Sequence, residues 1–198
     1  GFANVDSAQQ GCKPHHSRSL YLSLAMRYVS TRGGLAVGIE KAIMGGTADD
    51  GGLYVPEALP VIQAEEFVRY TEFPDIAARF LQPFFAGSSL AGRLSQICRA
   101  ALNFPLPLRH LESVPGSLAV LELFHGPTAA FKDVGARFLA HCMEQIISDG
   151  TFASAPVTVL VATSGDTGGA VASAYHRRPG TRGVVPFPGG RVAPRQQH

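Results

Sequence analysis

Lys132 is the residue whose type and setting point most directly to covalent chemistry. The residues before it, 127–131, carry no charge, and Gly126 with Pro127 predicts a tight turn that leads into a helix. An ammonium group that loses hydration gives up its proton more readily, and a neutral amine can attack a carbonyl carbon to form a Schiff base. Only three of the 17 basic residues are lysines, so arginine carries most of the positive surface charge and Lys132 requires a specific reason. The alternative is a lysine whose stem lies along the surface at a helix end.

A second candidate segment follows about thirty residues later. Residues 157–163 form an apolar, β-branched run, which predicts a strand buried on both faces. Ser164, Gly165, Asp166 and Thr167 come directly after it, and a helix is expected from residue 170. A strand, a polar glycine-rich turn and a helix together offer free backbone N–H groups and a helix dipole to an anion. An ordinary turn with Ser and Thr as helix caps is the alternative, and the segment matches no P-loop, dinucleotide-binding or hydrolase-elbow motif.

Four segments in order resemble those of one enzyme family. HGPTAAFKD at 125–133 and ATSGDTGGA at 162–170 are similar to the two signature segments of the threonine synthases, which use pyridoxal phosphate and have the type II, tryptophan-synthase-β-like fold. YVSTRG at 28–33 and DGGLYVPE at 50–57 agree with the same family. The resemblance runs from Met26 to about His198 and covers the N-terminal part of the family only.

The resemblance implies a reaction and a role for each site residue. The family is a group of carbon–oxygen lyases acting on phosphates. They convert O-phospho-L-homoserine and water to L-threonine and phosphate, through an aldimine of pyridoxal 5'-phosphate. This reaction is the last step of threonine biosynthesis. Lys132 would be the catalytic and cofactor-binding lysine, and it would move protons at the substrate's α and β carbons. Phe131 and Asp166 would contact the cofactor. Ser164, Gly165 and Thr167 would bind the substrate carboxylate. Thr128 would cap the pocket, and His125 would be either catalytic or a turn histidine bonded to backbone.

Composition limits the remaining function classes. Hydrophobic residues make up 45% of the chain, charged residues 16%, and the net charge is +2. No basic block implies a nucleic acid, and no apolar run approaches the ~20 residues of a membrane span. Three widely spaced cysteines fit reduced thiols in the cytoplasm, with Cys142 in a helical core. We therefore expect a cytoplasmic enzyme with a small-molecule substrate, no metal and an unknown oligomeric state.

The pattern of elements predicts an α/β protein with three segments. Residues 1–25 are expected to be a tail that is not native, 26–103 a small and mostly helical N-terminal domain, and 104–198 the first part of a pyridoxal-phosphate-binding α/β domain, truncated at its C-terminus. The helices expected in the small domain span 65–70, 74–85 and 88–102, and their apolar faces include Phe80 and Leu94.

The second domain is expected to hold a parallel sheet flanked by helices. Strands at 118–121, 157–163 and 184–187 alternate with helices at 132–148 and from 170, and ligands of such sheets bind at the carboxyl ends of the strands. Pro186 should interrupt the last strand because it lacks an N–H donor.

Two alternatives to an active enzyme remain at this point. The chain could be an inactive, truncated homologue of the family. It could also be a binding module that holds a phosphorylated metabolite at the glycine-rich turn without catalysis. The second alternative gives Lys132 no role, so chemistry at this lysine separates it from the enzyme hypothesis.

Overall fold

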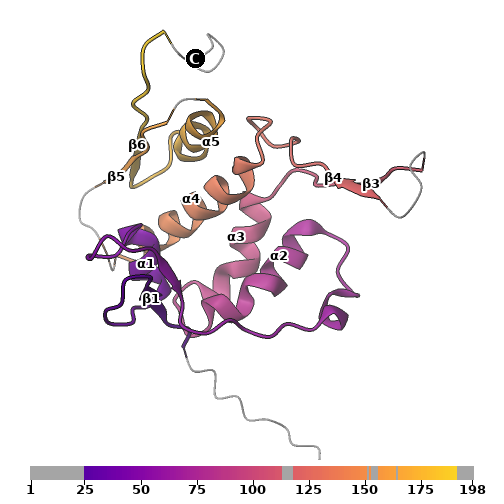
Figure 1. Ribbon diagram of the computed structural model, residues 1–198, viewed down its shortest axis with the longest axis horizontal. Coiled ribbons are helices and arrows are strands. Elements are labelled where there is room, and N and C mark those ends of the chain that lie inside the picture. Colours follow the sequence, from indigo (N-terminus) through magenta and orange to yellow (C-terminus); the bar gives the residue numbers. More distant parts are fainter. Residues whose placement is uncertain (1–24, 113–117, 151, 153–155, 164, 191–198) are drawn as a thin grey trace, which may run out of the picture.

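A computed structural model describes residues 25–112, 118–150, 152, 156–163 and 165–190 (Figure 1). The predicted tail at 1–25 lies outside these residues except for its last position, and so does the site residue Ser164. Among the described helices, none combines the length and the apolar character that a membrane span requires.

A small antiparallel sheet and one helix open the described chain. Strand β1 (Tyr28–Ser30) pairs with β2 (Tyr54–Pro56), and α1 (Ile39–Gly45) lies between them in sequence. The Asp50 carboxylate fixes the turn that precedes β2. It accepts hydrogen bonds from the Ser30 hydroxyl at 2.7 Å and from the Gly52 N–H at 2.8 Å. The hydrogen bond from Ser30 is the main reason that the pKa of Asp50 lies below its ordinary value.

The helices that follow are shorter than the sequence predicts. The first is a 3₁₀ turn, η1 (Ala64–Phe67), and α2 (Phe73–Leu81) gives way to η2 (Gln82–Phe85), where Pro83 cannot donate to the helical ladder. The third begins as η3 (Ala91–Arg93) and becomes α3 (Leu94–Ala101).

Two details of the predicted helices are wrong. Polar residues before the third helix predict Ser88 or Ser89 as its N-cap, but the Ser88 hydroxyl donates to the Phe85 carbonyl at 2.7 Å and the Ser89 hydroxyl to the Glu40 Oε1 atom at 3.1 Å. Phe80 was placed on the buried face of the second helix, but half of it is exposed. The inward face of this region instead includes Ala78 and Phe85.

The long helix α4 (Lys132–Ser148) has the predicted bounds and crosses the middle of the molecule (Figure 1). Its residues Cys142 and Ile146 are fully buried in one core cluster with Leu90, Leu94 and Ile97. The main core therefore combines residues from both segments into which the sequence was divided. Burial raises the pKa of the Cys142 thiol to about 12, as expected of an inert core thiol.

The strands of the second half form two separate pairs. Strand β3 (Leu108–His110) pairs antiparallel with β4 (Ala119–Leu121), and this hairpin projects from the body of the molecule (Figure 1). Strand β5 (Val157–Leu160) pairs in parallel with β6 (Thr181–Val184), and α5 (Asp166–Tyr175) connects them.

The predicted sheet is therefore correct only for β5 and β6. Strand β4 was expected in the same parallel sheet as β5, but it pairs antiparallel with β3 instead. The two segments are close in sequence, so their pairing closes a short loop at low entropic cost. Strand β6 lies at 181–184 rather than at the predicted 184–187, and it ends before Pro186, whose carbonyl accepts a hydrogen bond from the Thr163 N–H at 3.3 Å.

Candidate functional site

The turn before α4 is held by one buried carboxylate. Asp133 is 1% exposed, and its two oxygens accept hydrogen bonds from Thr128: the N–H donates to Oδ2 at 2.9 Å and the hydroxyl to Oδ1 at 2.8 Å. A buried carboxylate is stable only where such donors replace its water shell. Asp133, the second residue of α4, thus restrains the turn that leads into the helix.

Gly126 is required at its position because its backbone lies against Asp133. A Cβ atom there would come within 2.4 Å of the Asp133 Oδ2 atom and 2.7 Å of its Cβ. The turn is closed further by the Ala129 N–H, which donates to the Gly126 carbonyl at 3.1 Å, and Ala129 takes the unusual φ of 55°. These contacts leave the turn little freedom.

Lys132 is the first residue of α4 and is only partly buried. Its Nζ lies 4.3 Å from the centroid of the Phe131 ring, and that ring is 60% exposed. The ammonium group therefore rests on an aromatic face at the surface of the described chain, which is a favourable cation–π arrangement. A planar ligand could reach both groups.

Asp133 was not among the predicted site residues, and Thr128 contacts it directly. Thr128 was expected to cap the pocket, yet its hydroxyl and its N–H both point to Asp133. An acidic residue in the first helical turn, next to Lys132, is the sequence signal that indicates such a local restraint.

His125 contacts a side chain rather than the backbone. Its Nε2 lies 2.7 Å from the Glu122 Oε2 atom, and its ring is 4.6 Å from that of Phe124. Arg109 lies on the other side, with its Nε 3.8 Å from the Glu122 Oε1 atom. The predicted backbone partner for this histidine is thus replaced by a carboxylate that the β3–β4 hairpin holds in place.

The second predicted segment forms the turn before α5. Gly165 has a φ of 97° and a ψ of −143°, a conformation that is essentially restricted to glycine, and Asp166 and Thr167 begin the helix. Gly168 is buried, and a Cβ atom there would lie 3.1 Å from a methyl group of Val185. The ten-residue helix therefore begins at Asp166 rather than at the predicted residue 170, and its first N–H groups follow the glycine-dependent turn at Gly165.

The structure brings the two predicted segments onto neighbouring helices. Ala140 and Met143 of α4 pack with Ala174 and Tyr175 of α5, and the Tyr175 hydroxyl donates to the Met143 sulfur at 3.1 Å. These contacts join the second halves of the two helices. The predicted site residues lie at the first turns: Phe131 and Lys132 at α4, and Gly165, Asp166 and Thr167 at α5.

Comparisons with known proteins point to one family. Residues 27–102 match the family described as "Threonine synthase N terminus". The chain is 38% identical to the threonine synthase of Escherichia coli (strain K12) over 164 residues, which is 81% of this chain and 36% of that protein. It is 35% identical to that of Schizosaccharomyces pombe over 188 residues, or 89% of this chain and 36% of that protein.

Solved structures agree with these sequence matches. A threonine synthase of Brucella melitensis, described as bound to PLP, has a TM-score of 0.76 at 39% identity, over 87% of this chain and 38% of that one. The structure of the Escherichia coli enzyme has a TM-score of 0.75 at 36% identity, over 86% of this chain and 39% of that one. The chain thus spans little more than a third of the length of the relatives that it matches. By sequence and by fold, the chain is similar to the threonine synthases over this part of their length.

Proposed function

We propose that this chain carries the lysine and the anion-binding turn of a threonine synthase active site, which converts O-phospho-L-homoserine and water to L-threonine and phosphate. The observation that carries the proposal is the position of Lys132 as the first residue of α4, behind a turn that Asp133 holds fixed. Similarity to threonine synthases on both helices supports it. Because the relatives are longer, the proposal concerns only the part of the site that lies in this chain.

The residues at the start of α4 suit pyridoxal phosphate. The Lys132 amine is accessible, and the exposed Phe131 ring beside it offers an aromatic face to a planar heterocycle. When bound, this cofactor supplies an electron sink that stabilises negative charge on the substrate's carbon atoms. Lys132 would hold it covalently through Nζ, Phe131 would lie against it, and Asp166 would be close to it.

Lys132 would also transfer protons. With its Nζ free, the Lys132 amine would take a proton from the substrate's α carbon and transfer protons at the β carbon. In the overall reaction the β carbon would lose a proton and gain the hydroxyl group of water, while the γ carbon would lose phosphate and gain a proton, which balances to threonine and phosphate. The rigid turn before α4 would keep Nζ within reach of both carbon atoms, as efficient proton transfer requires.

The turn before α5 would bind the substrate carboxylate. Gly165 and Thr167 present backbone N–H groups at a helix start, where the helix dipole favours negative charge. Ser164, between Thr163 and Gly165, is proposed for the same role from the sequence alone. The location of the enzyme in the cytoplasm and the division at residue 103 are likewise proposals that rest on the sequence.

Chemical trapping on the full chain tests this function. The purified protein is mixed with pyridoxal phosphate, reduced with borohydride and digested, and the modified peptide is identified by mass spectrometry. We expect one modification, on Lys132, that is absent from Lys132→Ala and unchanged in Lys41→Ala. Modification of Lys41 alone would contradict the assignment. Saturable binding of a phosphorylated metabolite without any modified lysine would favour the binding-module hypothesis.

A further inference from the structure

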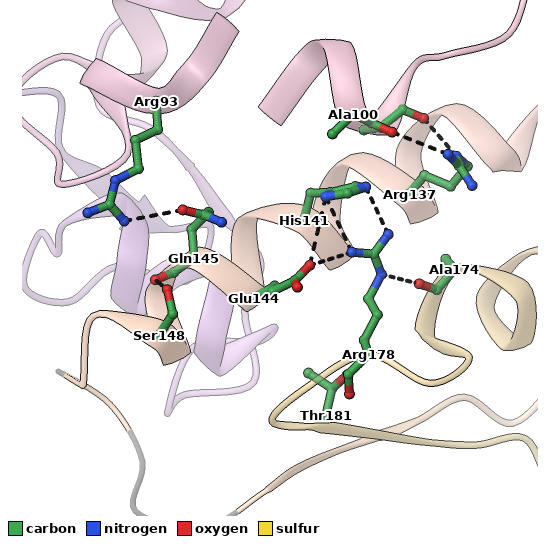
Figure 2. Close-up of polar contacts among 11 residues, drawn as sticks. Arg93, Ala100, Arg137, His141, Glu144, Gln145, Ser148, Ala174, Arg178 and Thr181 are labelled. Atoms are coloured by element: carbon green, nitrogen blue, oxygen red, sulfur yellow. Dashed lines mark hydrogen bonds and ion pairs between the residues drawn. The ribbon is translucent and has the colours of Figure 1, made fainter. Parts of the chain in front are cut away.

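Arg178, just after α5, makes a dense set of polar contacts with α4 (Figure 2). Its Nη1 donates to the Glu144 Oε2 atom at 2.5 Å, and its Nη2 lies 2.8 Å from the His141 Nε2 atom. Its Nε donates back to the Ala174 carbonyl in the last turn of α5. One guanidinium group therefore joins the end of α5 to the middle of α4.

This cluster is partly shielded from water. The side chains of Arg178, His141 and Glu144 are 14%, 19% and 28% exposed. Charge-assisted bonds of this kind are stronger and more directional than exposed ion pairs, and a forked guanidinium fixes orientation as well as distance. The cluster therefore restrains how α5 lies on α4.

A second contact fixes the same end of α5. Gly180 has a φ of 71°, and a Cβ atom there would come within 2.7 Å of the Cγ2 atom of Ile147 on α4. The connection from α5 to β6 thus lies directly against α4 on both sides of Pro179. Because a ten-residue helix moves nearly as a rigid rod, fixing its last turn also limits the movement of its first turn.

We infer that Arg178 is a positioning residue for the proposed site, because its bridge to His141 and Glu144 holds α5 on α4 and so sets the place of Gly165–Thr167 relative to Lys132. This role rests on the proposed function. It predicts that Arg178 touches neither substrate nor cofactor and acts only through α5.

The charges around His141 give the bridge a pH dependence. Burial lowers the pKa of His141 below its ordinary value, and the charges of Arg178 and Arg137 act in the same direction. Glu144 and the Ala100 carbonyl on α3 act in the opposite direction. The neutral ring accepts a hydrogen bond from Arg178, whereas a protonated ring has no acceptor nitrogen and would repel the guanidinium. Acidification should therefore loosen α5.

Amide hydrogen exchange on the complete chain, without cofactor, tests the restraint. We expect Arg178→Met to speed exchange of Gly169 and Ala170 by about tenfold or more, since the bonds to Glu144 and His141 are lost, while Ile97 in α3 is unchanged. Arg177→Met, at the exposed neighbouring arginine, should leave all of these rates unaltered. Arg178→Lys, which keeps the charge but not the fork, should give an intermediate rate. Equal acceleration in α3 and α5, or none in α5, would overturn the inference.

Two further measurements separate this role from a merely structural one. Corrected for intrinsic rates, exchange in α5 should rise below about pH 6.5 in the native chain, but not in His141→Gln, which keeps an acceptor that does not titrate. The yield of the borohydride-reduced adduct on Lys132 should fall in Arg178→Met and not in Arg177→Met. An unchanged yield despite faster exchange would overturn the positioning role, whereas no adduct in the native chain would refute the proposed function and leave the exchange result standing.

Discussion

The two turns that lead into α4 and α5 are held in opposite ways. The turn before Lys132 is fixed from within, because Asp133 binds Thr128 and packs against Gly126. The turn at Gly165 begins helix α5, which is fixed at its far end, where Arg178 contacts His141 and Glu144 on α4. A lysine that must reach reacting atoms benefits from a locally rigid turn. A turn that binds a substrate group can instead be positioned by contacts at the far end of its helix.

Removing the Asp133 carboxylate should have the largest effect on this contrast. Asp133→Ala removes two hydrogen bonds to a buried charged group, so we expect a loss of about 3–5 kcal/mol in the free energy of unfolding, measured by urea denaturation. Asp133→Asn, which keeps one acceptor oxygen, should lose less. Stability within about 0.5 kcal/mol of the native chain for Asp133→Ala would show that the turn is not held by this residue.

A methyl group at Gly126 should come next. Gly126→Ala forces an atom into the space occupied by the Asp133 carboxylate, and we expect a loss of about 1–3 kcal/mol. The matched control is Gly135→Ala, at the fourth residue of α4, where an added Cβ meets nothing within 4 Å. This variant should be more stable than the native chain by about 0.5–1 kcal/mol. If both variants shift the melting temperature alike, the close contact at Gly126 is not real.

At the far end of α5, Gly180→Ala should cost about 1–2 kcal/mol. The residue has a left-handed φ, and its added methyl group would collide with Ile147. In Gly180→Ala, amide hydrogen exchange should increase through α5 and not in the turn before Lys132. Equal increases in both regions would mean that the two turns share one restraint.

The smallest effect should come from pH. His141 has a lowered pKa in the folded chain, so the folded state binds fewer protons than the unfolded state between the two pKa values. This contribution to stability is complete above about pH 6.5 and is lost as the pH falls through the folded-state pKa. Melting temperatures should therefore fall less on acidification in His141→Gln than in the native chain. Identical curves would exclude His141 from the pH response.

Local patterns predicted the parts of the fold that local contacts decide. The bounds of α4 follow from its apolar ridge, which includes Cys142 and Ile146, and from Gly150 just beyond its end. The glycine-dependent turn at Gly165 was likewise visible, because polar and glycine residues follow an apolar strand.

Contacts between separate elements account for what the sequence did not reveal. The pairing of β4 with β3 depends on a three-residue segment behind two prolines, which offers no periodicity to detect. The bridge from Arg178 to His141 joins residues 37 positions apart, and no motif marks it. Phe80 shows the same limit, since its helical spacing favours burial while the neighbouring elements leave it exposed.

The proposed function requires that the starts of α4 and α5 face one site. Its most direct test is the amide NMR spectrum of the full chain before and after borohydride fixes pyridoxal phosphate on Lys132. We predict that the signals of Gly165, Thr167 and Gly168 shift together with those of residues 128–134, while those of α2 stay in place. Modification of Lys132 without any shift in Gly165–Gly168 would show that the two turns belong to different surfaces. This result would contradict the proposal that they form one site.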